Sequence, residues 1–262
     1  MIGKYSGVPP LLRVSDAGKI YPGGTEALRG ANLNIEAGEF VCLIGTSGCG
    51  KSTLLRMIGG FEMPTSGEVV MANRPVSGPG PDRGMVFQDY GLFPWLTVHG
   101  NIAFGPIARG KSKAEATAIA DRFVTMMGLD RFAKSFPHQL SGGMKQRESI
   151  GRVLANDARL ALMDEPFGAL DAMTRERLQE ELLEIWRSTG LSVVFVTHSL
   201  EEAIFLADRI VVMSPGPGRI VAEERITLER PRDVSSPEFN DIRRRLHIML
   251  HGDHHAQAGA AA

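Results

Sequence analysis

The sequence predicts an α/β fold in which helices cover both faces of a parallel sheet. Three observations lead to this fold: short apolar runs typical of buried strands, amphipathic segments with helical spacing between them, and a glycine-rich loop that joins one strand to a helix. In such a sheet, a ligand binds at the carboxyl ends of the strands. We therefore expect the functional residues to follow the strands in the sequence.

Composition limits the kind of protein this can be. The 262 residues suffice for one large α/β domain or a domain with a subdomain, and a net charge of −1 argues against general affinity for DNA or anionic lipid. No apolar run approaches the roughly 18 residues of a membrane span, and the N-terminus lacks the apolar core of a signal peptide. With only Cys42 and Cys49 present, we expect no structural disulfide and a reducing compartment.

The elements follow one another in a recognisable order. Residues 11–44 read as strands with turns, whereas residues 93–156 read as helical. In the helical part, Ile119, Phe123 and Met127 share one face and Gly128 can end their helix. Other apolar segments predict strands at 69–71, 84–87, 160–163, 193–196 and 210–213. Helices are predicted at about 178–190, after Ser199, which has capping-box spacing, and from Ser236-Pro237 to about 250. The tail that follows is predicted to be disordered.

A glycine-rich segment after the apolar run 40–44 matches the pattern of a phosphate-binding loop, G-x-x-x-x-G-K-[ST]. Its glycines allow several backbone N–H groups to point at one anion, and the helix that starts at Lys51 adds the positive end of its dipole. Lys51 can bind the β- and γ-phosphates, and the Ser52 hydroxyl can bind Mg²⁺. The loop comprises Gly45, Thr46, Ser47, Gly48, Cys49, Gly50, Lys51, Ser52 and Thr53.

Two acids end a second apolar strand. Asp164 follows the run 160–163, and its place at the strand tip suits a carboxylate that holds Mg²⁺ through its water shell. Glu165 is the next residue and can act as general base on a water that attacks the γ-phosphate. A strand that ends in Asp-Glu is often only a polar strand exit, but together with the phosphate loop it predicts an ATP-hydrolysing site.

A third segment indicates the family. Leu140–Arg147 reads Leu-Ser-Gly-Gly-Met-Lys-Gln-Arg, in which Ser141, Gly142 and Gly143 open a predicted helix and form a second anion site. This segment resembles the signature motif of the ATP-binding cassette (ABC) ATPases, and the resemblance extends over residues 11–250. In that family, the signature of one cassette closes over the ATP held by its partner, so the resemblance implies a dimer.

The resemblance assigns roles to four further residues. Tyr21 matches the aromatic residue that stacks on adenine. Gln88 matches the Q-loop glutamine near Mg²⁺ and the lytic water, and Asp171 matches the D-loop residue that contacts the partner cassette. His198 matches the switch histidine, which binds the γ-phosphate and orients Glu165 and the water.

The resemblance also implies an organisation of the chain. An N-terminal part with an antiparallel β-subdomain and part of the ATP-binding core is expected over 1–92, and a helical subdomain over 93–156. The core resumes over 157–232, and a C-terminal helix with its tail follows over 233–262.

The implied partners are a second copy of the chain, separate transmembrane permease subunits and, indirectly, a periplasmic solute-binding protein. The chain would lie at the cytoplasmic face of the inner membrane. The segments 89–98 and 214–221 resemble the nitrate, sulfonate and taurine importer branch. An exporter or lipid-handling cassette, a soluble cassette ATPase acting on ribosomes or DNA, and a small-molecule kinase remain as alternatives.

Overall fold

The computed structural model describes residues 9–87, 89–168 and 170–251. The chain divides into two compact units. The first comprises the residues up to Gly78 together with those from His198 onward, and the second is the continuous segment Pro79–Thr197. The two units have different architectures: the first carries an antiparallel sheet beside parallel strands, and the second carries a parallel sheet and a group of three packed helices.

The first unit contains two groups of strands. The antiparallel sheet has the order β2-β1-β4-β5. In the other group, β3 pairs in parallel with β9, and β9 pairs in antiparallel with β10. The elements of this unit are β1 (Leu12–Ile20), β2 (Glu26–Ile35), β3 (Phe40–Gly45), α1 (Lys51–Gly59), β4 (Ser66–Met71), β5 (Arg74–Pro75), α6 (Leu200–Leu206), β9 (Arg209–Ser214), β10 (Arg219–Arg225) and α7 (Pro237–His251).

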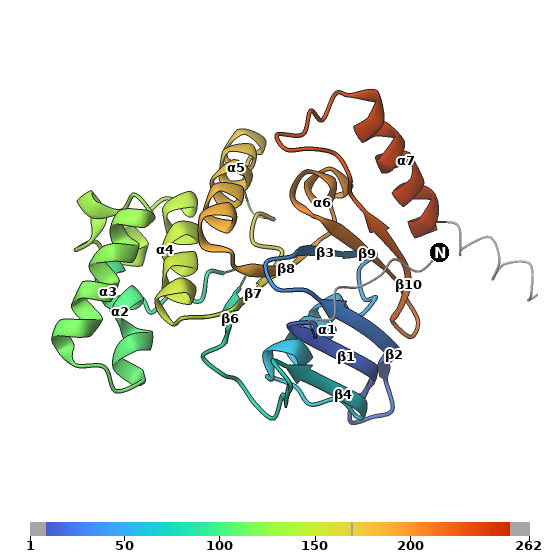
Figure 1. Cartoon of the computed structure of the whole chain (residues 1–262), viewed down its shortest axis with the longest axis horizontal. Helices are drawn as coiled ribbons and strands as arrows, with labels where there is room; N and C mark the ends of the chain where they lie inside the picture. Colours follow the sequence, from blue (N-terminus) through green and yellow to red (C-terminus); the bar gives the residue numbers. More distant parts are fainter. Residues whose placement is uncertain (1–8, 88, 169, 252–262) are drawn as a thin grey trace, which may run out of the picture. The chain divides into compact units, whose positions relative to one another are not determined.

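Strand β3 contributes to the buried core of the first unit. All six of its residues are buried, as are the first five of β9, because each strand contributes an unbroken apolar run. Helix α6 packs against β3, and α7 packs against α6 and β9 (Figure 1). The predicted helix at Ser236-Pro237 is confirmed, and Phe239 and Leu246 are its fully buried anchors. Cys42 and Cys49 are both free and buried, as expected.

The second unit contains a parallel sheet of order β8-β7-β6 and three helices, α2, α3 and α4, that pack against one another (Figure 1). The predicted helix that ends at Gly128 is confirmed: Phe123 is buried, and Gly128 adopts φ 63° just after α3. The elements are β6 (Arg83–Val86), α2 (Val98–Ala108), α3 (Lys113–Met126), η1 (Asp130–Phe132), η2 (Pro137–Gln139), α4 (Gly142–Ala155), β7 (Leu160–Asp164), α5 (Ala172–Thr189) and β8 (Ser192–Thr197).

The predicted fold class is confirmed in its main parts: parallel strands joined through helices, an N-terminal antiparallel sheet, and a helical part. Helix caps fall where the sequence indicated them, since the hydroxyls of Ser141 and Ser199 accept backbone N–H bonds at the starts of α4 and α6. Within residues 9–87, 89–168 and 170–251, every helix is too short or too polar to cross a bilayer. The predicted disordered tail beyond residue 251 lies outside the described residues.

Candidate active site

The phosphate-binding loop lies between β3 and α1, as the motif predicts. Helix α1 begins at Lys51, and Gly50 precedes it with φ 88° and ψ 6°. A Cβ atom on Gly50 would lie 2.8 Å from the carbonyl oxygen of Ala27, so only glycine fits this approach. Gly50 offers α1 no side-chain cap, which leaves the N–H groups of the first turn directed at the loop. Ser47 and Gly48 are exposed at the loop tip.

Lys51 folds back over this loop. Its side chain is buried, with 7% of the residue exposed, and its Nζ donates hydrogen bonds to the carbonyl oxygens of Gly45 at 2.8 Å and Thr46 at 3.1 Å. The Cys49 sulfur lies 3.6 Å from the same nitrogen. A buried ammonium needs such acceptors because water cannot solvate it there. The loop therefore holds a cation at its centre, where phosphate oxygens can take the place of the carbonyl groups.

Tyr21, the candidate adenine-stacking residue, follows β1 and is linked to the phosphate loop. Its hydroxyl oxygen lies 3.4 Å from Oγ1 of Thr53, the last residue of the loop motif. The same hydroxyl donates a hydrogen bond of 2.7 Å to Oε2 of Glu62. The Lys19 ammonium lies 5.3 Å from the centroid of the ring. The first unit thus brings the aromatic ring and the phosphate loop together through direct contacts.

His198 follows β8 and precedes the cap of α6. Its side chain is exposed, whereas Thr197, the last residue of β8, is buried. The end of a buried parallel strand is where the fold class predicts functional residues. His198 belongs to the first unit, as do Lys51 and Ser52.

The candidate acids of the second unit lie at the end of β7. Asp164 is the last strand residue, and both Asp164 and Glu165 are half-buried. Glu165 has φ 46°, a left-handed conformation that costs a non-glycine residue about 1 kcal/mol or more. Two backbone hydrogen bonds maintain it: the Glu165 N–H donates to the Val196 carbonyl at 3.0 Å, and the Gly168 N–H donates to the Glu165 carbonyl at 3.1 Å. The candidate general base is therefore held in a strained, fixed backbone position.

The signature segment begins helix α4. The Ser141 hydroxyl accepts a hydrogen bond of 3.3 Å from the Met144 N–H, and Gly142 is the first helical residue. A Cβ atom on Gly142 would lie 2.9 Å from Cδ2 of Leu170, so this glycine allows the start of α4 to lie close to the residues before α5. The Ser141 hydroxyl takes up one N–H group of this helix start, and the helix dipole adds the positive end that favours an anion.

Asp171 caps helix α5 in this structure. Its Oδ1 accepts a hydrogen bond of 3.0 Å from the Thr174 N–H. Hydrogen bonding to the Thr174 backbone, and to a smaller extent to the Thr174 side chain, lowers the pKa of the Asp171 carboxyl. The sequence indicated a contact with a partner cassette but not this cap. Gln88, the predicted Q-loop glutamine, lies outside the described residues, as does Ala169, which is two residues before Asp171.

Sequence reasoning did not single out Asn101, which fixes the segment after position 88. Asn101 is fully buried on α2, and its Oδ1 accepts a hydrogen bond of 2.8 Å from the Phe93 N–H. Its amide nitrogen donates to the carbonyl groups of Phe93, Leu96 and Thr97 at 3.2–3.3 Å. One side chain therefore serves four backbone groups of this loop. No local sequence pattern reveals this, because the partners become neighbours only when the loop returns to α2.

Arg152, on α4, binds the same segment further upstream. Its guanidinium donates to the carbonyl oxygens of Gly91 at 2.5 Å and Tyr90 at 3.4 Å. It also lies 5.6 Å from the centroid of the Phe93 ring. Together, Asn101 and Arg152 attach the segment 90–97 to helices α2 and α4.

Glu148 lies one helical turn before Arg152 and is completely buried. Neither of its carboxyl oxygens has a hydrogen-bond partner among the described residues. Burial raises the pKa of Glu148 to about 7, and the nearby positive charges of Arg152 and Lys145 only partly offset this. A buried acid in this condition takes up a proton near neutral pH.

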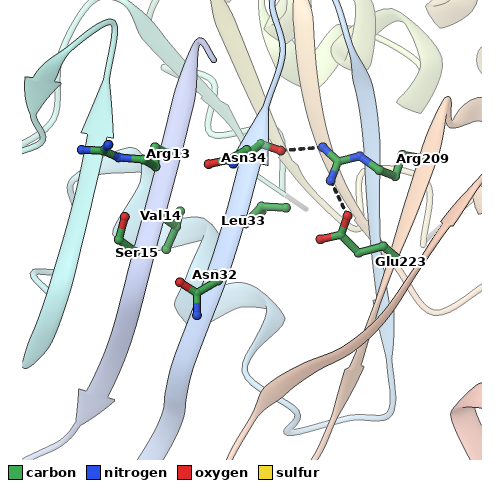
Figure 2. Close-up of a pocket in the computed structure, with 8 residues that line it drawn as sticks. All are labelled: Arg13, Val14, Ser15, Asn32, Leu33, Asn34, Arg209 and Glu223. Carbon is green, nitrogen blue, oxygen red and sulfur yellow. Dashed lines mark hydrogen bonds and ion pairs between the residues drawn. The ribbon is translucent and has the colours of Figure 1, made fainter. Parts of the chain in front are cut away.

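The described residues of the first unit also form a cavity of about 300 Å³, which contains none of the predicted site residues (Figure 2). Arg209, in its wall, donates to Glu39 at 2.8 and 2.9 Å, to Glu223 at 2.7 Å and to the Asn34 carbonyl at 2.5 Å. Burial alone would lower the pKa of Arg209, but Glu39 and then Glu223 raise it above its usual value. These bonds already occupy the Arg209 guanidinium, so we do not assign a ligand to this cavity.

Comparison with known proteins places these features in a family. The sequence model of the family described as "ABC transporter" matches residues 28–168. An uncharacterised ABC transporter ATP-binding protein of Methanocaldococcus jannaschii is 49% identical over 91% of both chains. The nitrate import ATP-binding protein NrtD of Synechocystis is 46% identical over 87% of this chain and 86% of its own. The taurine import ATP-binding protein TauB of Chromobacterium violaceum is 48% identical over 86% of this chain and 90% of its own.

A solved structure is similar in the same way. The dimeric ATP-binding cassette MJ0796, in a post-hydrolysis state with ADP and Pi, superposes with a TM-score of 0.72 at 35% identity and covers 83% of this chain and all of its own. The phosphate loop at β3–α1, the acids after β7 and the signature segment at α4 thus occur in a chain whose sequence and fold both match one family. The chain belongs to the ABC transporter family and is an ATP-binding cassette ATPase.

Proposed function

We propose that this chain is the ATP-hydrolysing subunit of a bacterial ABC importer. The observation that carries the proposal is the presence, in one chain, of a phosphate loop closed around Lys51 and a signature segment capped by Ser141. The solute we propose is a small anion or an organosulfur compound of the nitrate, sulfonate or taurine type. The relatives named as nitrate and taurine import proteins support this class.

In the proposed site, Lys51 and the N–H groups of α1 bind the triphosphate, and the ring of Tyr21 stacks on adenine. Ser52 and Asp164, with Gln88, offer the hydroxyl, carboxylate and amide oxygens that Mg²⁺ prefers, and the ion would neutralise charge on the phosphates. Glu165 accepts a proton from the attacking water, and His198 orients that water and the γ-phosphate. The fixed backbone of Glu165 supports its role, because a general base must be held in place.

The site is completed by a second copy of the chain. Ser141, Gly142 and Gly143 of one copy would face the nucleotide bound by the other, and Asp171 would contact its partner. The dimeric similar structure supports this arrangement. We propose the organisation expected from the sequence: core residues 1–92 and 157–232, a helical subdomain at 93–156 and a C-terminal segment at 233–262.

Closure and reopening of two cassettes would make ATP a switch on dimer geometry. The movement would act on transmembrane permease subunits, to which a periplasmic solute-binding protein delivers the solute. The chain would then lie at the cytoplasmic face of the inner membrane as a peripheral subunit.

The test is a co-purification from native membranes with a tagged Glu165→Gln chain and ATP. This variant keeps the nucleotide site and lacks the general base, so it should accumulate in the closed, partner-bound state. Mass spectrometry should then identify a multi-span permease together with a solute-binding protein. A tagged Lys51→Ala chain, which should not bind ATP tightly, is the matched control. Recovery of ribosomal or DNA-associated proteins without a permease would contradict the importer.

A further inference from the structure

Glu62 lies beside the candidate adenine ring although it is outside every motif in the sequence. Its Oε2 accepts the 2.7 Å hydrogen bond from the Tyr21 hydroxyl. That hydroxyl also lies 3.4 Å from Oγ1 of Thr53 in the phosphate loop motif. Tyr21 is therefore attached at its tip to two points on the α1 side of the first unit.

The turn at the end of α1 brings Glu62 to this position. Gly60 ends the helix with φ 75°, and its N–H donates to the carbonyl groups of Arg56 and Met57. The Phe61 N–H also donates to the Arg56 carbonyl at 2.9 Å, so the chain folds back along the helix it has just left. On the other side, a turn holds the backbone of Tyr21, whose N–H donates to the Thr25 carbonyl at 2.9 Å.

Two cations lie beside the Glu62 carboxylate. Lys19 Nζ lies 3.6 Å from Oε2, and an Arg56 nitrogen lies 3.6 Å from Oε1. The Glu62 and Lys19 side chains are each only 17% exposed, and Lys19 is held further by a 2.8 Å hydrogen bond to the Met63 carbonyl. An ionised carboxylate forms a stronger hydrogen bond with a phenol than a neutral acceptor does.

Lys19 also limits how a base can stack. Its ammonium lies over the Tyr21 ring at 5.3 Å from the centroid, which occupies one face of the ring. The opposite face is then the one that can receive a planar purine. Since the hydroxyl is tied to Glu62 and Thr53, that face has a defined distance and direction from the phosphate loop.

We propose that Glu62 is a positioning residue that holds the Tyr21 ring in register with the phosphate loop, so that the base and the triphosphate of one nucleotide are bound together. This rests on the proposed stacking role of Tyr21. Glu62 itself does not touch the nucleotide. Its effect is to order the ring before ATP arrives, so that less binding free energy is lost in fixing it.

The experiment compares two ligands, ATP and inorganic tripolyphosphate, which has the phosphates but no base. Binding of each to the full chain is measured by calorimetry with Mg²⁺. Tyr21→Phe and Glu62→Ala should each weaken ATP binding by about 3- to 10-fold, the effect of one lost charge-assisted hydrogen bond. The double variant should be no weaker than either single variant, because both remove the same bond. In Glu62→Ala, tripolyphosphate binding and the kcat at saturating ATP should stay within 2-fold.

Two further variants control for structural damage. Glu62→Gln keeps an acceptor for the phenol and should restore most of the ATP affinity lost in Glu62→Ala. Glu68→Ala removes an exposed acid of the same unit that forms an ion pair with Arg13, so it should leave both affinities unchanged.

Tyr21→Ala separates this inference from the function on which it rests. If that variant binds ATP as tightly as the parent chain, the stacking role fails. If it weakens ATP binding selectively while Tyr21→Phe and Glu62→Ala do not, the stacking role stands and the positioning role of Glu62 is overturned. Equal loss of ATP and tripolyphosphate binding in Glu62→Ala would also overturn it, since a damaged phosphate loop would then explain the effect.

Discussion

Lys51 in the first unit and Glu148 in the second are both buried charged residues, and they are accommodated in opposite ways. Lys51 has two carbonyl oxygens as hydrogen-bond acceptors, both from residues within its own loop. Glu148 has no hydrogen-bond donor on its carboxyl oxygens among the described residues. Burial therefore raises the pKa of Glu148 and holds its carboxyl nearer to the neutral form.

The two side chains obtain their polar partners in different ways. The phosphate loop carries its partners within nine residues, so the motif specifies both the charge and its surroundings. Glu148 depends on neighbours that are used elsewhere: Asn101 binds the backbone of the segment 93–97, and Arg152 binds Gly91 and Tyr90. A substitution at Lys51 should therefore act on ligand binding, and one at Glu148 on stability.

The largest expected effect is that of Lys51→Ala on ATP binding. Loss of the only buried ammonium of the loop motif should weaken ATP affinity by on the order of 100-fold or more, because the β- and γ-phosphates lose their cation. The free energy of unfolding should fall by only about 1–2 kcal/mol, because the carbonyl groups of Gly45 and Thr46 lose one shared hydrogen-bond donor. Calorimetric titration and urea unfolding measure the two quantities. Unchanged nucleotide affinity would contradict the assignment of the loop.

The next effect is a pH-dependent gain of stability in Glu148→Gln. The pKa of Glu148 is raised from 4.5 to about 7, so the folded chain keeps this proton after the unfolded chain has lost it. The stability contribution of the neutral acid is therefore fully present below pH 4.5 and is lost as the pH rises through about 7. Glutamine resembles the neutral acid, so the variant should be more stable than the parent chain by about 1–3 kcal/mol at pH 8.

Urea unfolding of both chains at pH 5 and pH 8 checks this prediction. The difference should be small at pH 5 and should grow with pH. Glu238→Gln is the matched control, because this acid lies on the exposed face of α7 and should show no such trend. A constant difference across this range would mean that Glu148 does not titrate in the folded chain, and the contrast with Lys51 would be weaker.

The smallest effect is expected at Asp171. Asp171→Ala removes the cap of α5 and should lower the free energy of unfolding by about 1 kcal/mol, whereas Asp171→Asn keeps an oxygen for the Thr174 N–H and should cost less. Urea unfolding at pH 7 measures both. An equal loss in the two variants would mean that the negative charge, and not the cap, matters at this position.

Local patterns predicted the parts of the fold that depend on residues close in sequence. The strand–loop–helix at β3 and α1, the end of α3 at Gly128 and the start of α7 at Pro237 each follow from spacing and caps within a few residues. The positions of Asp164 and Glu165 at the end of β7 follow in the same way, from an apolar run that stops at an acid.

The remaining features could not be predicted because their partners are distant in the sequence. Tyr21 meets Glu62 across 41 residues, and Arg152 meets Gly91 across 61. Neither pair leaves a periodic trace, so each requires the tertiary structure. The burial of Glu148 could not be predicted either. Helix α4 is buried on most sides, whereas a helical pattern alone places an acid on the face that is exposed to solvent.

The hydrogen bonds of Lys51 to its own loop have a consequence for the reaction cycle. Since the ammonium already has the carbonyl oxygens of Gly45 and Thr46 as acceptors, arrival of a triphosphate would exchange one set of oxygens for another. The same exchange would run in reverse when the products leave, and the ammonium would return to the backbone carbonyl groups. Departure of ADP would then cost less free energy than from a loop whose cation had no other acceptor, and the main chain of the loop would take up the ammonium again before the next turnover.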